Sequence, residues 1–158
     1  MVIILAVLAA VVVPQFSSST TDAQMSALQQ DLATVRSALE LYKAQHNGIY
    51  PGAVASSGGT CPTGATAGTG AAGSAQAFSD QLSYPSNASG ATCTTLAADA
   101  AAGFKYGPYL RKGVPAEPTS SVATVTITTT GAAITASGTG WAADTVSGQF
   151  ISNSNPSY

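Results

Sequence analysis

The most one-sided stretch of the hydrophobic pattern lies at the start of the chain. From Met1 to Val13 every side chain is apolar, and Pro14 then interrupts the run. A helix of this length reaches about 20 Å, which is shorter than the roughly 30 Å core of a bilayer. A secretory signal would carry a basic leader, and no Lys or Arg precedes Val2. We therefore expect the natural chain to have further apolar residues before Met1.

A second, amphipathic pattern begins at Met25. Apolar residues recur at alternating steps of four and three, which is typical of one face of a helix. They are Leu28, Leu32, Val35, Leu39 and Tyr42, with Ala38 and Leu41 widening the stripe. Asn47-Gly48 is a C-terminal stop signal and Pro51 prevents continuation, so we expect the helix to end near His46.

The middle of the chain is rich in Gly, Ala, Ser and Thr and has little periodicity. Residues 47–78 therefore have the composition of a loop or even of a disordered tract, although residues 76–82 could form a short helix. Cys61 and Cys93 are either a disulfide or two unpaired buried thiols. We favour the disulfide, because a loop with few apolar anchors needs a covalent link and an exported chain would be oxidised.

Beyond Pro118 the hydrophobic period changes to two, which predicts β-strands. The first strand is half-buried, with apolar residues alternating with threonines, and Gly131 forms a turn to a return strand around Ile134. The segment from Asp144 to Gly148 joins a second pair. The expected strands are residues 123–128, 133–136, 141–143 and 149–152.

These elements predict an α+β fold in which a long N-terminal helix packs against a small C-terminal antiparallel β-sheet. The helix is expected to be interrupted near Pro14. Residues 1–24 form an apolar arm for assembly or membrane insertion, residues 25–47 the amphipathic half of the helix, and residues 48–158 a globular head. We expect the helix and the head to pack through Leu28, Leu32, Val35, Leu39, Tyr42, Tyr109 and Trp141.

Composition favours an exported, surface-displayed protein over a cytosolic enzyme. Charged residues make up 8% of the chain and the net charge is −2, so clustered Lys and Arg for nucleic acid are lacking. His46 is the only histidine, which removes most catalytic triads. Its position at a helix end, away from other metal-binding residues, favours a surface or capping role over a metal site.

Several motifs resemble the type IV pilin family. The run Ala9-Ala10-Val-Val-Val-Pro14-Gln15-Phe16, followed by a long amphipathic helix, is similar to the N-terminal helix of type IV pilins and of type II secretion pseudopilins. Three later segments are similar to the G-type major pseudopilins. They are Asn47-Gly48-Ile49-Tyr50-Pro51, Tyr106 to Lys112, and Gly140-Trp141 through Ile151. The resemblance covers both ends of the chain well and the middle poorly.

This resemblance implies a filament subunit that polymerises with identical copies through its apolar helix. Before assembly the arm would lie in the inner membrane, and assembly machinery would transfer it to a cell-surface filament. The alternatives are a pseudopilin in a short periplasmic secretion piston, or a membrane-anchored monomeric binding module. The implied assembly core is Ile3, Ile4, Leu5, Val7, Leu8, Val11, Val12, Val13 and Phe16.

The chain departs from the family pattern in three respects. The basic leader, processing site and early glutamate of the family are absent before Met1, and Ala6 stands where members often carry glycine. G-type pseudopilins bind calcium through acidic residues near the C terminus, and here only Asp144 has a plausible counterpart. Because calcium takes six to eight oxygen ligands, we expect neither calcium nor another cofactor.

Pro14 suggests a mechanical property of the arm. It lacks the N–H that would bond the carbonyl of Ala10, and the β-branched residues 11–13 tolerate extended backbone. Our hypothesis is that the chain unwinds between about Ala6 and Pro14 in a filament. The alternative is a kink in a continuous helix.

Overall fold

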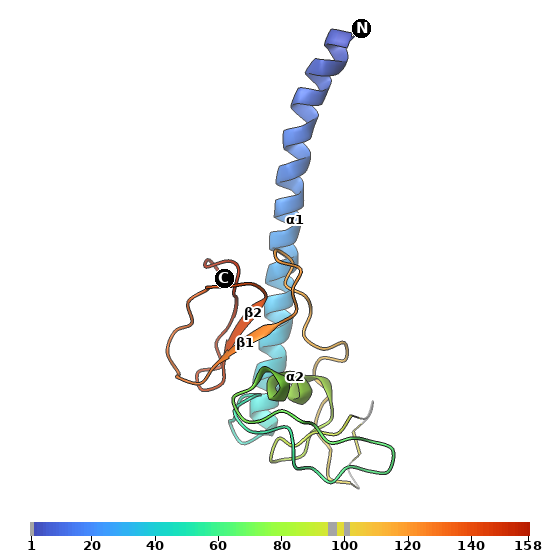
Figure 1. Ribbon diagram of the computed structural model, residues 1–158, viewed down its shortest axis with the longest axis vertical. Coiled ribbons are helices and arrows are strands. Elements are labelled where there is room, and N and C mark those ends of the chain that lie inside the picture. The colour runs from blue at the N-terminus through green and yellow to red at the C-terminus, as the bar shows by residue number, and fades with distance from the viewer. Residues whose placement is uncertain (1, 95–97, 100–101) are drawn as a thin grey trace.

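The computed structural model contains a long helix, a short helix and a small sheet. The elements are α1 (Val2–Gln45), α2 (Ala75–Ser83), β1 (Val125–Thr128), β2 (Trp141–Asp144) and β3 (Phe150–Ser152). The structure describes the backbone of residues 2–94, 98–99 and 102–158, and side chains only from residue 20 onward within these ranges. Figure 1 shows the head gathered around the C-terminal half of α1, while the N-terminal half projects beyond it. The predicted α+β class is confirmed.

The C-terminal half of α1 buries the predicted stripe. Leu28, Leu32, Val35, Leu39 and Tyr42 are each at most 2% exposed, and Ala38 is buried beside them. The prediction for Leu41 was wrong, since its side chain is 52% exposed. At about 100° per residue, that position falls well outside the stripe and reaches solvent.

α1 ends where the stop signal predicts. Asn47 adopts a left-handed conformation with φ 56°, and Gly48 follows with φ 82°. The Gly48 N–H donates to the carbonyl of Lys43 at 2.9 Å, which satisfies one of the free carbonyls of the last turn. The expected end near His46 is confirmed.

α1 extends through Pro14 as one helix, so the interruption predicted near Pro14 is not present in the single chain. A proline removes one hydrogen bond, here the bond to the carbonyl of Ala10. Hydrogen bonds in the neighbouring turns are sufficient to keep the backbone helical across that gap.

The sheet is mixed, which corrects the antiparallel prediction. The strand order is β1-β2-β3, with β1 and β2 parallel and β2 and β3 antiparallel. Val125 lies opposite Trp141, and Ala143 lies opposite Phe150. The predicted β2–β3 hairpin is therefore confirmed, whereas residues 133–136 form no strand.

The Asp144 carboxylate explains the parallel pairing. Its Oδ2 accepts hydrogen bonds from the N–H groups of Thr130 (3.0 Å) and Gly131 (3.1 Å), so the chain leaving β1 is held at the end of β2. Residues 132–140 then run back outside the sheet, and the Trp141 N–H bonds the Thr124 carbonyl at 2.9 Å. A parallel pair needs a crossover of about a dozen residues, which residues 129–140 provide.

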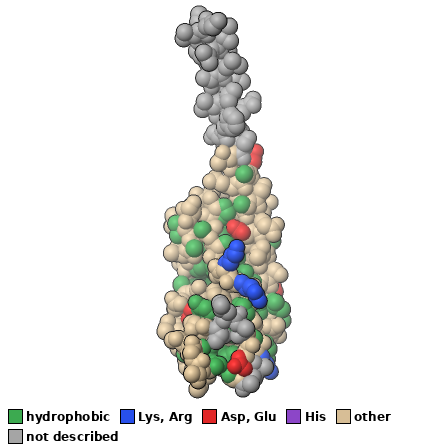
Figure 2. All heavy atoms as spheres, turned by 90° about the vertical axis from the view of Figure 1, so that its right-hand side faces the viewer, with side chains coloured by type: hydrophobic (Ala, Val, Ile, Leu, Met, Phe, Trp, Pro, Cys, Tyr) green, Lys and Arg blue, Asp and Glu red, His purple; other side chains and the backbone are tan. Residues whose placement is uncertain are grey.

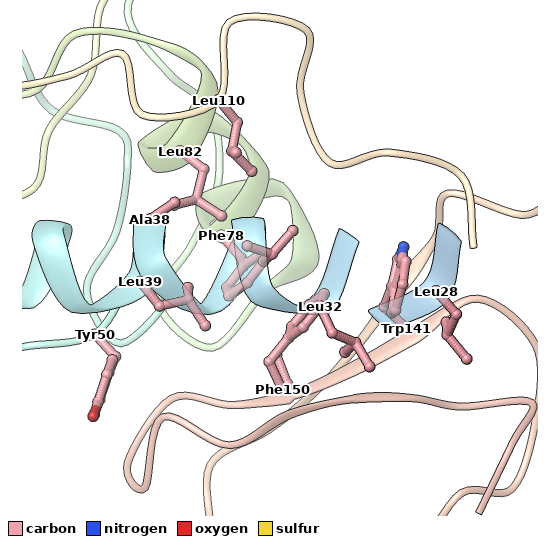
Figure 3. Packing of buried hydrophobic residues seen from close by; sticks show 12 residues of the cluster. Leu28, Leu32, Ala38, Leu39, Tyr50, Phe78, Leu82, Leu110, Trp141 and Phe150 are labelled. Carbon is pink, nitrogen blue, oxygen red and sulfur yellow. The ribbon is translucent and has the colours of Figure 1, made fainter. Parts of the chain in front are cut away.

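One hydrophobic core joins α1, α2 and the sheet (Figure 3). Trp141 and Phe150 stack with ring centroids 5.1 Å apart, and Phe78 of α2 lies 6.2 Å from Phe150. Leu82 is fully buried beside them. The predicted short helix that carries Phe78 and Leu82 inward is confirmed, since both belong to this core.

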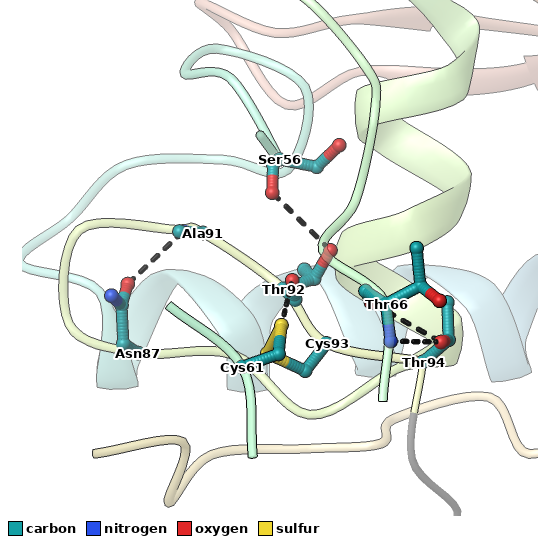
Figure 4. Close-up of a disulfide and its surroundings, with 8 residues drawn as sticks. All are labelled: Ser56, Cys61, Thr66, Asn87, Ala91, Thr92, Cys93 and Thr94. Carbon is teal, nitrogen blue, oxygen red and sulfur yellow. Dashed lines mark hydrogen bonds between the residues drawn. A yellow bond between two sulfur atoms is a disulfide. The ribbon is translucent and has the colours of Figure 1, made fainter. Parts of the chain in front are cut away.

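The glycine- and serine-rich segment is an ordered loop, not a disordered tract. The carbonyl of Ser56 accepts a hydrogen bond from the Thr92 N–H at 2.9 Å (Figure 4). The Ser56 hydroxyl donates to Asp80 of α2 at 2.6 Å, and the Gly70 N–H donates to the Ser56 hydroxyl at 2.8 Å. Buried polar contacts thus replace the apolar anchors that this loop lacks.

Gln81 of α2 binds two loop segments at once. Its fully buried amide accepts from the Gly52 N–H at 2.6 Å and donates to the carbonyls of Val54 (3.0 Å) and Gly90 (2.8 Å). A buried amide with all these bonds made is stable, while an unpaired one would be costly. No periodicity or motif in the sequence identifies this residue.

Cys61 and Cys93 form the predicted disulfide, with their Cα atoms 5.7 Å apart (Figure 4). The bridge lies beside a second, small hydrophobic cluster that contains Ala91 and Phe104. It connects the loop before α2 to the segment after it.

We predict that replacing both cysteines by serine lowers the free energy of unfolding by about 3–4 kcal/mol. The reason is the closure entropy of the loop, which spans a sequence separation of 32 residues. Urea titration of the full chain in detergent, followed by tryptophan fluorescence, measures the change. Alkylation of the native protein provides the control, since two reactive thiols without reductant would contradict the disulfide.

Candidate assembly surface

The residues predicted for assembly lie in the part of α1 whose side chains are not described. The assembly-core residues are Ile3, Ile4, Leu5, Val7, Leu8, Val11, Val12, Val13 and Phe16, and the helix-break residues are Ala6, Ala10 and Pro14. The structure gives the helical backbone of this arm and its direction away from the head (Figure 1). From residue 20 to residue 23 the described side chains are exposed. The head therefore leaves residues 20–23 of α1 exposed, and the helical backbone before them projects beyond the head.

The C-terminal tail marks where the head begins on α1. Tyr158 packs partly against the core, and the Gln29 amide donates to its hydroxyl at 3.2 Å. The Asn155 amide lies 3.7 Å from the sulfur of Met25. Tail and helix thus meet at the boundary between the predicted arm and the predicted amphipathic half.

The residues predicted to join helix and head are brought together. Leu28, Leu32, Val35, Leu39 and Trp141 belong to one core, against which Tyr109 packs. The buried Tyr42 ring meets the Tyr109 ring edge to face at 5.4 Å, and the Tyr109 hydroxyl donates to Gln45 at 2.6 Å. This contact connects the head firmly to the helix that carries the arm.

Arg36 has a role that the sequence did not indicate. It lies off the buried stripe of α1, and its Nε and Nη2 donate to the carbonyl of Phe150 at 3.1 and 2.8 Å. The guanidinium therefore binds the β3 edge of the sheet, which blocks further strand pairing on that side.

His46 is buried, which corrects its expected surface position. Its Nδ1 lies 2.9 Å from the carbonyl of Tyr42, which can only accept, so Nδ1 carries the proton. Nε2 then accepts from the Ser86 hydroxyl at 3.0 Å. The ring stacks on Tyr42 at 3.8 Å and meets Tyr106 edge to face at 5.0 Å. The capping part of the prediction is confirmed by the bond to the last turn of α1.

This environment lowers the pKa of His46. Burial disfavours the charged ring and outweighs hydrogen bonds to the backbone of Tyr42 and Asn87, which act in the opposite direction. The imidazole is therefore neutral in the folded protein near pH 7.

Asp144 is saturated by donors from its own chain. Its Oδ1 accepts hydrogen bonds from the N–H groups of Val146 (3.0 Å) and Ser147 (2.7 Å). Its Oδ2 accepts from the Thr128 hydroxyl (2.9 Å) and from the N–H groups of residues 130 and 131. Burial would raise the pKa of this carboxyl, but hydrogen bonds led by the Ser147 N–H hold it well below its usual range.

The surroundings of Asp144 do not suit a cation, because N–H and O–H donors occupy the positions where a cation would need oxygen ligands. Among the side chains described, no three acidic, cysteine or histidine residues form a group that could hold a metal.

Glu117 is a second fully buried carboxylate held by donors. It accepts from the Thr119 hydroxyl, from the Ser120 N–H at 2.6 Å and from the Ser152 hydroxyl at 3.1 Å. Burial raises its pKa, but these hydrogen bonds lower it to about 2. Glu117 thereby connects the loop before β1 to β3.

A shallow groove of about 460 Å³ runs along the outer face of α1 beside the segment that contains Tyr109 and Leu110. The exposed Leu41 side chain lies in it, together with Ala33 and Ser37. Figure 2 shows that charged side chains are few on the face it displays. The surface thus offers small, mostly uncharged groups for contact.

Within the part of α1 and α2 that has described side chains, neither helix has both the length and the hydrophobicity needed to cross a bilayer. Comparisons with protein-family models, curated proteins and solved structures found no match to this chain.

We predict that the folded protein loses stability as the pH falls from about 7 to 5.5. The folded pKa of His46 is lowered, so below its ordinary value near 6.5 the unfolded chain binds a proton that the folded chain does not. Thermal melting of the full chain in detergent at both pH values measures the loss. His46→Gln should melt lower than the unaltered chain at pH 7 but change little across this range. Equal pH dependence of both proteins would refute the prediction, because the lowered pKa values of Glu117 and Asp144 keep these two buried carboxylates charged throughout this range.

Proposed function

We propose that this chain is the structural subunit of a type IV pilus-like helical filament and polymerises through its apolar N-terminal helix. The observation that supports this proposal is the division of α1. Its buried stripe from Leu28 to Tyr42 carries the head, and its N-terminal half extends beyond the head (Figure 1). The sequence of that extension is apolar from Met1 to Val13.

The chemistry of the arm requires a partner. Ten of the residues from Met1 to Val13 are Met, Val, Ile or Leu. Each would gain about 1.5–3 kcal/mol on leaving water, so an arm exposed to solvent is unstable as a separate element. Lipid and a bundle of identical helices are the two environments that remove this cost, the first before assembly and the second afterwards.

Transfer between these two environments has a small hydrophobic driving force. Lipid tails are as apolar as the side chains of the arm, so packing between helices must stabilise the filament. We therefore infer an inner-membrane precursor, assembly machinery that extracts it, and a cell-surface homopolymer as the product. The function of the protein then lies in polymerisation, with no catalytic step.

Electron microscopy of sheared cell-surface material tests the proposal. We expect long fibres that contain this chain, identified by mass spectrometry. A lysine within the arm, Val7→Lys, should reduce the fibre yield by about tenfold or more, since a charge inside an apolar bundle costs several kcal/mol. Val146→Lys is the matched control, because Val146 is 60% exposed on the head.

The same experiment separates the alternatives. Absence of the chain from sheared fibres at high expression would contradict the filament and favour a secretion piston or a monomeric anchored module. Equal fibre yields from Val7→Lys and Val146→Lys would show that the arm is not the polymerisation element.

We further expect the arm to unwind between about Ala6 and Pro14 when it packs in the filament. Pro14 has already removed one hydrogen bond in the single chain, and β-branched residues 11–13 tolerate extended backbone. A filament density map from electron cryomicroscopy shows this directly. Continuous helix from Val11 to Pro14 in that map would disprove the unwinding, and filaments of Pro14→Ala should retain the helix.

A further inference from the structure

The outer edge of the sheet is the free side of β1. In this parallel pair the Thr124 carbonyl accepts from the Trp141 N–H at 2.9 Å, so the backbone of every second residue faces β2. The intervening residues, Val125 and Ile127, direct their N–H and C=O groups away from the sheet. Within the described part of the chain these four groups have no hydrogen-bond partner.

Two of the usual protections against strand pairing, charged side chains and proline, are missing from β1, although α2 lies against this strand. Edge strands are commonly blocked by charged side chains, by proline or by a covering element. Arg36 blocks the β3 edge, but no charged residue occurs from Pro118 to Ala143. A groove of about 300 Å³ lies beside β1, and its uncharged lining includes Ala75, Gln76, Gly113 and Val114. A segment with short side chains could therefore approach β1 through this groove.

A segment of the same chain has matching unpaired groups. Residues 132–137 have a strand-like sequence but form no strand, and most of them are exposed. The Ile134 N–H donates to the Gln149 side chain at 2.7 Å, and the Ser137 N–H to the Asn153 side chain at 3.0 Å. Among the described residues, the backbone groups of Ala133 and Thr135 have no partner.

We propose that residues 132–137 of one copy add to the free edge of β1 in a second copy as an antiparallel strand. Val125 would pair with Thr135, and Ile127 with Ala133, so that each pair exchanges two hydrogen bonds. Thr126 then lies opposite Ile134 at the position between these pairs. All eight unpaired groups are satisfied in this arrangement.

A second copy is the occupant that the chain itself supports. Both segments are uncharged, so approach meets no like-charge repulsion, and Ala133 and Thr135 are small enough for the groove. The two surfaces differ, so each copy donates to one neighbour and accepts from another, which produces an open chain of heads when the rotation between copies does not close a ring. This inference rests on the proposed filament. Four hydrogen bonds are too few to join free heads, and the packed arms supply the necessary proximity.

Disulfide trapping tests the pairing. In the full chain, Thr126→Cys combined with Ile134→Cys places the new thiols opposite each other, at a separation that a disulfide can span. The native cysteines remain paired with each other. Mild oxidation of cells should then give a series of dimers, trimers and longer species on non-reducing gels, and reductant should return them to monomer. The matched control is Thr126→Cys with Ser89→Cys, because Ser89 is exposed on a different loop.

The outcomes separate this inference from the filament itself. Fibres of the double-cysteine protein that remain monomeric on the gel overturn the strand pairing and leave the filament intact. A covalent series in membrane fractions without fibres supports the pairing and overturns the filament. Monomers without fibres overturn both.

Hydrogen exchange on the unaltered protein gives a second measurement that does not depend on folding of a variant. The amides of Val125, Ile127, Ala133 and Thr135 should exchange at least about tenfold more slowly in fibres than in detergent-solubilised monomer. Unchanged exchange at these four amides would refute the proposal.

Discussion

The whole head depends on the burial of one stripe of α1. The sheet has three strands of three or four residues each, and such a small sheet is marginal unless it packs against another element. Leu28, Leu32 and Leu39 provide that surface, and Trp141 and Phe150 cover it from the sheet. The same helix continues into the arm, so any force on the arm reaches the core of the head directly.

Buried polar groups complete what this stripe begins. A chain rich in Gly, Ala, Ser and Thr has few large apolar side chains with which to order long loops. Gln81, Asp144 and Glu117 therefore hold the loops through hydrogen bonds made inside the protein, where an unpaired partner is costly. Asp144 is notable because chain donors satisfy a carboxylate that could otherwise have helped to bind a cation.

Several features of the sequence and of the sheet support the proposed contact between identical copies. The arm is apolar, the net charge is −2, and a long uncharged segment includes both the free β1 edge and residues 132–137. Arg36 blocks one edge of the sheet and leaves the other open. An open edge promotes aggregation in a monomeric protein, whereas in a filament subunit it is available for ordered contact.

The sequence by itself determined the helix stripe, the helix end at Asn47-Gly48, the short helix and the β2–β3 hairpin, because these follow from local periodicity and turn chemistry. Parallel pairing of β1 was not predictable, since it depends on Asp144 binding the chain fourteen residues earlier at Thr130. The burial of His46 and the role of Gln81 likewise depend on loops that arrive from distant parts of the chain. Only tertiary structure decided these features, because a polar side chain can be buried at low cost only where distant parts of the chain supply its hydrogen-bond partners.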